Sequence, residues 1–218
     1  MDPALLEHVV AKAVAAGADA AEAVGAERRS LTVTVRLGKL EEVEREESAD
    51  LGLRVFIGRK QAVVSGSDVS PAALERLVER AVAMARLAPE DPYAGLAEPE
   101  RLAREPFPDL QLYDPAEPSA ATLEERARAA EDAARAVPGV TNSEGGSASW
   151  GESAWSFVTS AGFMGRHRGS AFSISASAIA GEGSGMERGG EGRSTRFQAD
   201  LPPPTPSALR RDAGPWRA

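Results

Sequence analysis

The sequence contains no cysteine and only two histidines, His8 and His167. The lack of cysteine excludes disulfides, thiolate nucleophiles and cysteine-ligated zinc or iron–sulfur sites, and it is typical of a reducing compartment. The two histidines are far apart in the chain, so they cannot supply the paired imidazoles, one helical turn apart, of the common zinc hydrolases. We therefore exclude a paired-histidine zinc site and predict no metal ligand in this chain.

Long apolar runs and an excess of basic residues are also missing. No apolar stretch approaches the roughly 20 residues that cross a bilayer. The start, Met1-Asp2-Pro3, lacks the basic and apolar regions of a signal peptide. The formal net charge of −8 and the pI near 5.0 argue against nucleic acid as the main partner, because phosphate binding depends on clustered Lys and Arg. We expect a cytoplasmic protein without direct contact to nucleic acid or membrane.

Three helices are predicted where apolar side chains recur at three- and four-residue spacing. They cover residues 3–16, 71–87 and 121–137. The third is rich in Ala, Glu and Arg, and it is stopped by Pro138 and the glycine that follows. His8 falls outside the apolar stripe of the first helix, which predicts an exposed helix residue rather than a ligand.

Alternating apolar and polar residues predict strands in two regions, one before the second helix and one after the third. Before it, an antiparallel meander is expected from residues 31–37, 40–45, 51–57 and 61–65. After the third helix, a second sheet is expected from residues 140–149, 153–160 and 170–180. Residues 181–195 are glycine-rich and charged, and we expect them to form an exposed loop.

These elements predict an α+β fold of antiparallel sheets with helices packed on one face. Seven prolines between residues 88 and 119 indicate a long irregular connection, which favours two sub-domains. The predicted organisation is an N-terminal α+β unit (1–90), a proline-rich connection (91–119), a second α+β unit (120–195) and an irregular tail (196–218). The tail shows no periodicity and is expected to be disordered, as in a truncated or frameshifted reading.

Two polar stretches are candidates for binding. The acidic run that contains Glu41, Glu42, Glu44, Glu46 and Glu47 lacks the glycine and alternating Asp/Asn oxygens of a calcium loop, so we interpret it as solvated surface. The string Val140-Thr141-Asn142-Ser143-Glu144-Gly145-Gly146 has an ordinary interpretation as turn and bulge chemistry, in which the glycines permit positive φ. The alternative is a ligand site, in which Asn142 and Glu144 would contact a peptide.

Five strings, taken in order, resemble the N-terminal region of the TldD/PmbA family, and its PmbA (TldE) branch in particular. They are AGADAAEA, SLTVTVRLGKLEEVERE, LGLRVFIGRKQAVVSGSDVSP, PEDPYAGLA and VTNSEGG followed by serine. The resemblance covers roughly residues 3–203 and fades in the basic tail. Members of the family are about twice as long, with a large C-terminal domain that has no counterpart in this sequence.

The resemblance implies a heterodimeric zinc metallopeptidase that degrades or processes unfolded peptides. Its zinc motif, of the HExxxH kind, lies on the TldD-type subunit, and no position of this chain matches it, so the resemblance implies no catalytic residue here. Members are linked to peptide-antibiotic maturation and carry the older name of modulators of DNA gyrase. The chain is therefore expected to be part of a non-catalytic PmbA-type subunit, with no cofactor of its own and with zinc on a TldD-type partner.

Two other functions stay open at this point. The chain could be a stand-alone peptide- or protein-binding module without protease activity, and co-purification with a TldD-type protein would separate this alternative from the first. A nucleic-acid-linked regulator is the third possibility, and the negative charge of the chain speaks against it.

Overall fold

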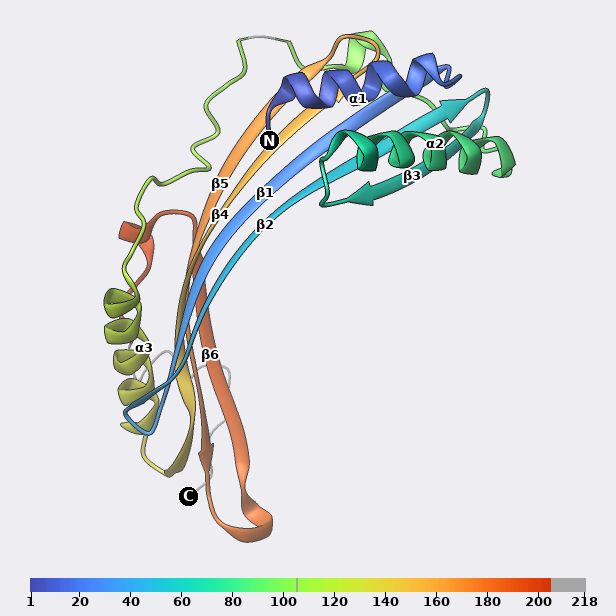
Figure 1. The fold of residues 1–218 in the computed structure, drawn as a ribbon. Helices are drawn as coiled ribbons and strands as arrows, with labels where there is room; N and C mark the ends of the chain where they lie inside the picture. Colours follow the sequence, from blue (N-terminus) through green and yellow to red (C-terminus); the bar gives the residue numbers. More distant parts are fainter. Residues whose placement is uncertain (105, 205–218) are drawn as a thin grey trace. The chain divides into compact units, whose positions relative to one another are not determined.

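The computed structural model describes residues 1–104 and 106–204. Three α-helices and six strands make up the fold (Figure 1). The helices are α1 (Pro3–Ala15), α2 (Pro71–Leu87) and α3 (Ala120–Arg135), and the strands are β1 (Ala20–Arg36), β2 (Lys39–Ile57), β3 (Lys60–Gly66), β4 (Val140–Thr159), β5 (Met164–Ala180) and β6 (Glu187–Thr195). The α+β class is confirmed, and the three helices lie within two residues of their predicted ends.

The strands form one antiparallel sheet in the order β3-β2-β1-β4-β5-β6. The segments after residue 140, which we expected to form a second sheet, extend the first one, because β4 lies beside β1. The strands are also longer than predicted: residues 39–57 and 140–159 are each a single strand. Alternation in the sequence identifies strand segments, but it does not show which segments pair.

The prediction of an exposed loop over residues 181–195 was wrong. Glu187–Thr195 is strand β6, which pairs with β5 from Phe172↔Thr195 to Ala180↔Glu187. Its glycines hide the strand pattern, and one of them leaves little room for a side chain: a Cβ on Gly190 would lie 2.7 Å from the Ser177 hydroxyl and 3.2 Å from the Ala176 carbonyl oxygen. An edge strand can form on such a weak sequence because its neighbour supplies the hydrogen-bonding template.

Two compact units share the chain, and each is assembled from three segments. The first unit contains Met1–Arg28, Glu47–Leu110 and Ser153–Arg168, and the second contains Arg29–Glu46, Gln111–Glu152 and Gly169–Ala218. These units do not coincide with the consecutive stretches 1–90 and 120–195, because β1, β2, β4 and β5 each contribute residues to both.

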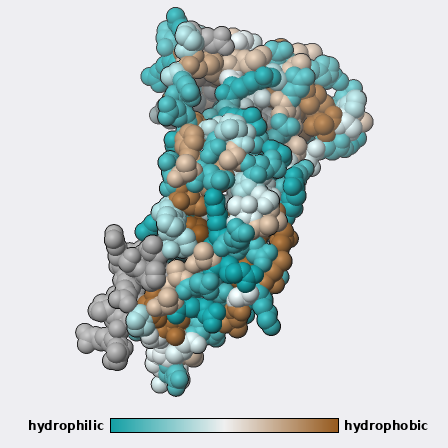
Figure 2. Space-filling model, turned by 90° about the vertical axis from the view of Figure 1, so that its left-hand side faces the viewer, coloured by the Kyte–Doolittle hydropathy of each residue, from teal (hydrophilic) through white to brown (hydrophobic). Residues whose placement is uncertain are grey.

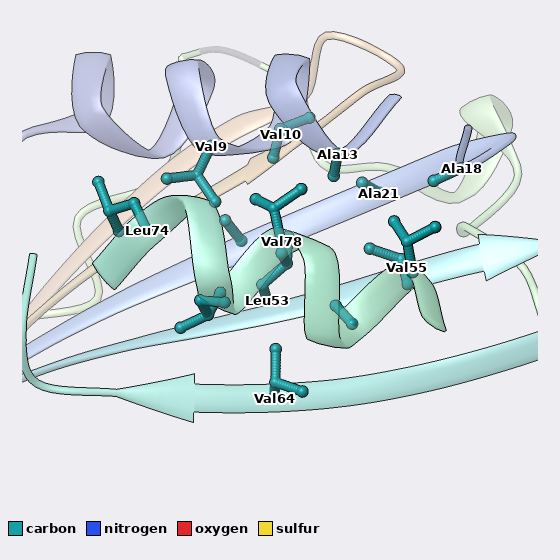
Figure 3. Close-up of a cluster of buried hydrophobic side chains, with 14 of the residues drawn as sticks. Val9, Val10, Ala13, Ala18, Ala21, Leu53, Val55, Val64, Leu74 and Val78 are labelled. Carbon is teal, nitrogen blue, oxygen red and sulfur yellow. The ribbon is translucent and has the colours of Figure 1, made fainter. Parts of the chain in front are cut away.

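The first unit has an aliphatic core between two helices and the sheet. Side chains of α1 and α2 point toward the strands, as Figure 3 shows for Val9 and Val78 above Leu53. Leu6, Val9 and Leu53 are completely buried. Full burial of one such side chain contributes roughly 1.5–3 kcal/mol, so this cluster is the main source of stability in the unit.

The second unit has a single helix over its strands. Leu123 and Ala127 of α3 pack against Val33, Trp150 and Phe172 from three strands. A second cluster joins Ala130 and Ala134 of α3 to Ile174, Ala176 and Ala178 of β5. Because most helix side chains in these clusters are alanine, α3 can approach the sheet closely.

Between α2 and α3, where an irregular connection is predicted, the described residues contain only a 3-10 turn, η1 (Pro99–Arg101). The predicted tail begins after β6 with another such turn, η3 (Gln198–Asp200), and its residues 205–218 lie outside the described part of the chain. On the face drawn in Figure 2, hydrophilic residues predominate and hydrophobic ones form small separate groups. No helix in the described ranges is long and apolar enough to span a bilayer.

Candidate functional site

A buried carboxylate lies under the polar string of residues 140–146, in the second unit. Glu131 of α3 is 0% exposed. Its two oxygens accept hydrogen bonds from the backbone N–H groups of Leu37 (2.6 Å) and Gly38 (2.8 Å). The Ser143 hydroxyl, in the polar string, donates to the same carboxylate at 2.5 Å. Glu131 therefore joins α3, the turn between β1 and β2, and the start of β4.

The turn held by Glu131 has an unusual backbone. Leu37 and Gly38 connect β1 to β2, and both have positive φ, 51° and 71°. A two-residue hairpin turn with positive φ at both central residues matches the twist of its strands, and glycine adopts this conformation freely whereas leucine does not. The Arg128 guanidinium also donates to the Gly38 carbonyl oxygen. Helix α3 thus supplies both a carboxylate for the turn's N–H groups and a donor for its carbonyl, which offsets the strain at Leu37.

Hydrogen bonding favours the ionised form of Glu131. Burial alone raises the pKa of this carboxyl, because the charged form loses water. The bonds from Ser143, Gly38 and Leu37 together favour the charged form more strongly. The positive charge of Arg135 adds to them, so the pKa of Glu131 lies below its usual value.

The two glycines of the polar string allow α3 to touch the sheet. A Cβ on Gly146 would lie 2.1 Å from the Ala127 carbonyl oxygen and 2.9 Å from the Glu131 nitrogen. Gly145 has φ +114°, and a Cβ there would lie 2.8 Å from the Val35 oxygen. Ser143 is buried before this pair and Ala148 after it, so the buried side of β4 shifts by one residue, as at a β-bulge. The shift matches the bulge interpretation of this string, and its two glycines let α3 pack closely against β4.

Asn142 and Glu144, the predicted peptide-contacting residues, flank Ser143 on β4. Because they are two residues apart in a strand, they share the face opposite Ser143. Asn142 is exposed, and its side-chain oxygen accepts a hydrogen bond from the Ser143 N–H at 2.8 Å. Glu144 is half-buried and pairs with Arg188 of β6 at 2.5 Å. The structure therefore gives both residues local partners and leaves Asn142 accessible to solvent.

The two histidines both lie in the first unit, His8 on α1 and His167 on β5, and both are exposed. Within residues 1–104 and 106–204, no group of three or more His, Asp or Glu side chains is placed to hold a metal ion.

Sequence reasoning missed Glu131, although a signal was available. Leu123, Ala127, Ala130 and Ala134 mark the sheet-facing stripe of α3, and position 131 falls inside it. A charged residue on an apolar stripe is buried only when it is paired or hydrogen-bonded, so it deserves a search for partners. The partners themselves, Leu37 and Gly38, are more than 90 positions away and could not be found this way.

Comparison with known proteins identifies the family of this fold. Residues 21–85 match the model of PmbA/TldA metallopeptidase domain 1, and residues 113–211 match that of the PmbA/TldA metallopeptidase central domain. The chain belongs to the PmbA/TldD metallopeptidase family. The second match continues past residue 203, where we expected the resemblance to end.

Two curated relatives support the same assignment. Metalloprotease PmbA of Escherichia coli O157:H7 is 35% identical over 204 residues, which are 92% of this chain and 45% of that protein. The Metalloprotease PmbA homolog of Haemophilus influenzae is 33% identical over 183 residues, covering 84% and 40% of the two chains. The chain thus spans slightly less than half the length of the curated relatives it matches.

Solved structures share the fold. A protein named as a modulator of DNA gyrase from Bacteroides thetaiotaomicron superposes with a TM-score of 0.84 at 22% identity, over 92% of this chain and 46% of that one. TldE from Thermococcus kodakarensis superposes with a TM-score of 0.71 at 18% identity, over 88% and 43%. At these identities the superpositions establish a common fold.

Proposed function

We propose that this chain acts as the non-catalytic, PmbA-type partner in a two-subunit zinc metallopeptidase that degrades or processes unfolded peptides. The observation that carries the proposal is its 35% identity to Metalloprotease PmbA, combined with a sequence that holds only two, widely separated histidines. Zinc hydrolases need three protein ligands around the metal, and two of these are commonly paired imidazoles. In the proposed complex, the zinc belongs to the TldD-type subunit.

The contribution of this chain would be to bind the partner and to help hold the substrate. A structural neighbour carries the name TldE, which supports a TldD/TldE type of pairing. Asn142 and Glu144 remain our proposed peptide contacts, because an exposed amide and a carboxylate on one strand face can bond to an extended backbone.

Metal content and cleavage, measured together, test the proposal. The purified chain is analysed for zinc by elemental analysis, alone and after mixing with a TldD-type protein, and cleavage of an unfolded peptide is followed in both samples. We expect zinc and cleavage only in the mixture. Stoichiometric zinc in the isolated chain would overturn the assignment of the metal to the partner.

The alternative is a stand-alone peptide- or protein-binding module. It shares the same fold and the same lack of paired histidines, and it differs in needing no TldD-type protein. Size-exclusion chromatography of the mixture separates the two: co-elution supports the subunit, whereas separate elution combined with peptide binding supports the module.

The peptide contacts need a test of their own. In a complex that cleaves peptide, Asn142→Ala and Glu144→Ala should raise KM while kcat stays within about twofold, because a binding contact contributes equally to ground and transition states. The matched control is Asn142→Asp, which keeps the side-chain oxygen that accepts from the Ser143 N–H. Unchanged KM in both alanine variants would remove these residues from the substrate site.

A further inference from the structure

One edge of the sheet is open in the second unit. Strand β3 pairs with β2 only from Leu51↔Gly66 to Ile57↔Lys60. In the strand order, no described strand lies outside β2 before Leu51, and Figure 1 shows β3 beside only the later part of β2. Every residue from Lys39 to Glu44 is exposed. A strand edge of this kind offers backbone N–H and C=O groups to another extended chain.

The geometry of the turn tells which backbone groups face outward. Arg36 and Lys39 flank the two-residue turn, so their backbone groups bond to each other. Because the direction alternates along a strand, the N–H and C=O groups of Leu40, Glu42 and Glu44 point away from β1. These three residues form the edge that a further strand would use.

Anchoring makes this edge a preformed surface. The turn at its start is fixed to α3 through the bonds from Leu37 and Gly38 to the buried Glu131. A strand that is already ordered loses little conformational entropy when it binds a ligand, which favours affinity.

The side chains of the edge select the occupant. Leu40, Glu42 and Glu44 lie on one face of the strand, and Glu41 and Val43 on the other. Leu40 and Val43 are 49% and 48% exposed, and the Glu41 carboxylate lies 4.0 Å from the Arg36 guanidinium. Basic side chains on an added strand would lie next to the glutamates, and apolar ones next to Leu40 and Val43. A second copy of this chain is disfavoured, because antiparallel self-pairing centred on Glu42 would put Glu42 against itself.

We propose that the Lys39–Glu44 edge of β2 binds a basic peptide segment in extended conformation by strand addition. This activity belongs to the chain alone and goes beyond the proposed subunit role, since it needs neither zinc nor a TldD-type protein. The peptide-binding proposal can therefore fail while the subunit role stands, and the subunit role can fail while peptide binding stands.

The test uses the whole 218-residue chain and three fluorescein-labelled probes. The first is an alternating Lys-Val octapeptide, the second is the same peptide N-methylated at alternate amides, and the third is an alternating Glu-Val octapeptide. Fluorescence anisotropy should show saturable binding of the first probe alone. Equal binding of the N-methylated probe would overturn strand addition, because charge attraction alone would then explain the binding. Absence of binding by the first probe would also overturn the proposal.

Variants of the chain locate the site. Reversing two charges, Glu42→Lys with Glu44→Lys, should weaken binding of the Lys-Val probe about tenfold or more, because two attractive pairs with the lysines of the probe become repulsive. The matched control is Glu79→Lys with Glu90→Lys, which makes the same change of net charge at exposed positions of the first unit and should leave binding unchanged. Equal weakening in both double variants would overturn the assignment to this edge.

Amide hydrogen exchange gives a readout without any mutation. Bound Lys-Val peptide should slow exchange at Leu40, Glu42 and Glu44, while Glu41 and Val43, which bond to β1, are already protected. Protection elsewhere on the sheet instead would overturn the site. If sedimentation shows a dimer of the chain that Glu42→Pro dissolves, the edge is a self-association surface and the peptide proposal is overturned.

Discussion

The two compact units bury different chemistry. The first unit packs two helices and its strands around leucine and valine side chains, in one cluster. The second unit packs one alanine-rich helix against its strands, with the buried carboxylate Glu131 among the apolar side chains. The stability of the first unit therefore depends mainly on how much apolar volume is buried, whereas that of the second also depends on where individual atoms lie.

This difference shows how a helix with few large apolar side chains can still be held in one position on a sheet. Alanine and glycine bury little area, so α3 gains less than α1 and α2 from the hydrophobic effect. Because these side chains are small, α3 lies close enough to the sheet for Glu131 to reach the turn between β1 and β2. We expect the second unit to be destabilised most by larger side chains at the contact between α3 and the sheet. The first unit should be destabilised most by smaller side chains in its core.

The largest effect is expected from filling the contact between α3 and β4. Gly146→Val should destabilise the second unit by about 3 kcal/mol or more, because its Cβ has no room between Ala127 and Glu131. Hydrogen exchange measured by mass spectrometry should show faster exchange in α3. Gly185→Ala is the control, since a Cβ there meets nothing within 4 Å. A Gly146→Val protein as stable as the original would mean that α3 packs more loosely than described.

A cavity in the core of the first unit should lower the free energy of unfolding nearly as much. Leu53 is 0% exposed, so Leu53→Ala is expected to cost about 3 kcal/mol of unfolding free energy. Urea denaturation provides the measurement, and hydrogen exchange should place the loss in α1 and α2. Leu87, which is 87% exposed, gives a matched Leu→Ala control with an effect near zero. If both substitutions cost the same, volume in this core is not what stabilises the unit.

A smaller effect is expected from Glu131→Gln, which keeps the shape of the side chain and removes one acceptor. An amide has a single oxygen for the three donors of Leu37, Gly38 and Ser143, so at least one buried donor loses its partner. We expect a cost of about 2 kcal/mol and faster exchange at the β1–β2 turn. Glu125→Gln, at an exposed position of α3, controls for the loss of charge. Equal stability of the two variants would argue against the carboxylate clamp.

The smallest effect is the pH dependence that Glu131 adds. Its pKa is lower in the folded chain than the ordinary value of 4.5, so the unfolded chain binds more protons in the interval between the two values. Stability from this group is thus complete above about pH 4.5 and is lost as the pH falls through the folded pKa. The free-energy difference between the original chain and Glu131→Gln should shrink over that interval in urea titrations. A difference that grows as the pH falls would contradict this assignment.

Local order was within reach of the sequence. The three helices follow from apolar periodicity and from proline and glycine at their ends, and α3 ends at Arg135, two residues before the end that Pro138 and Gly139 predicted. The family followed from five short strings, of which VTNSEGG marks the place where α3 meets β4. In each case, neighbouring residues supply the signal, because helix ends and tight turns are decided by contacts within a few positions.

The tertiary structure alone decided what pairs with what. Nothing local shows that β4 lies beside β1, that β6 forms at all on a glycine-rich segment, or that Glu131 reaches Leu37 and Gly38. Strand pairing and burial of a charge depend on partners that are distant in the chain, and their free energies appear only when the partners meet. The sequence by itself thus determined the helices, the turns and the family, while the single sheet, its open edge and the buried carboxylate came from long-range contacts.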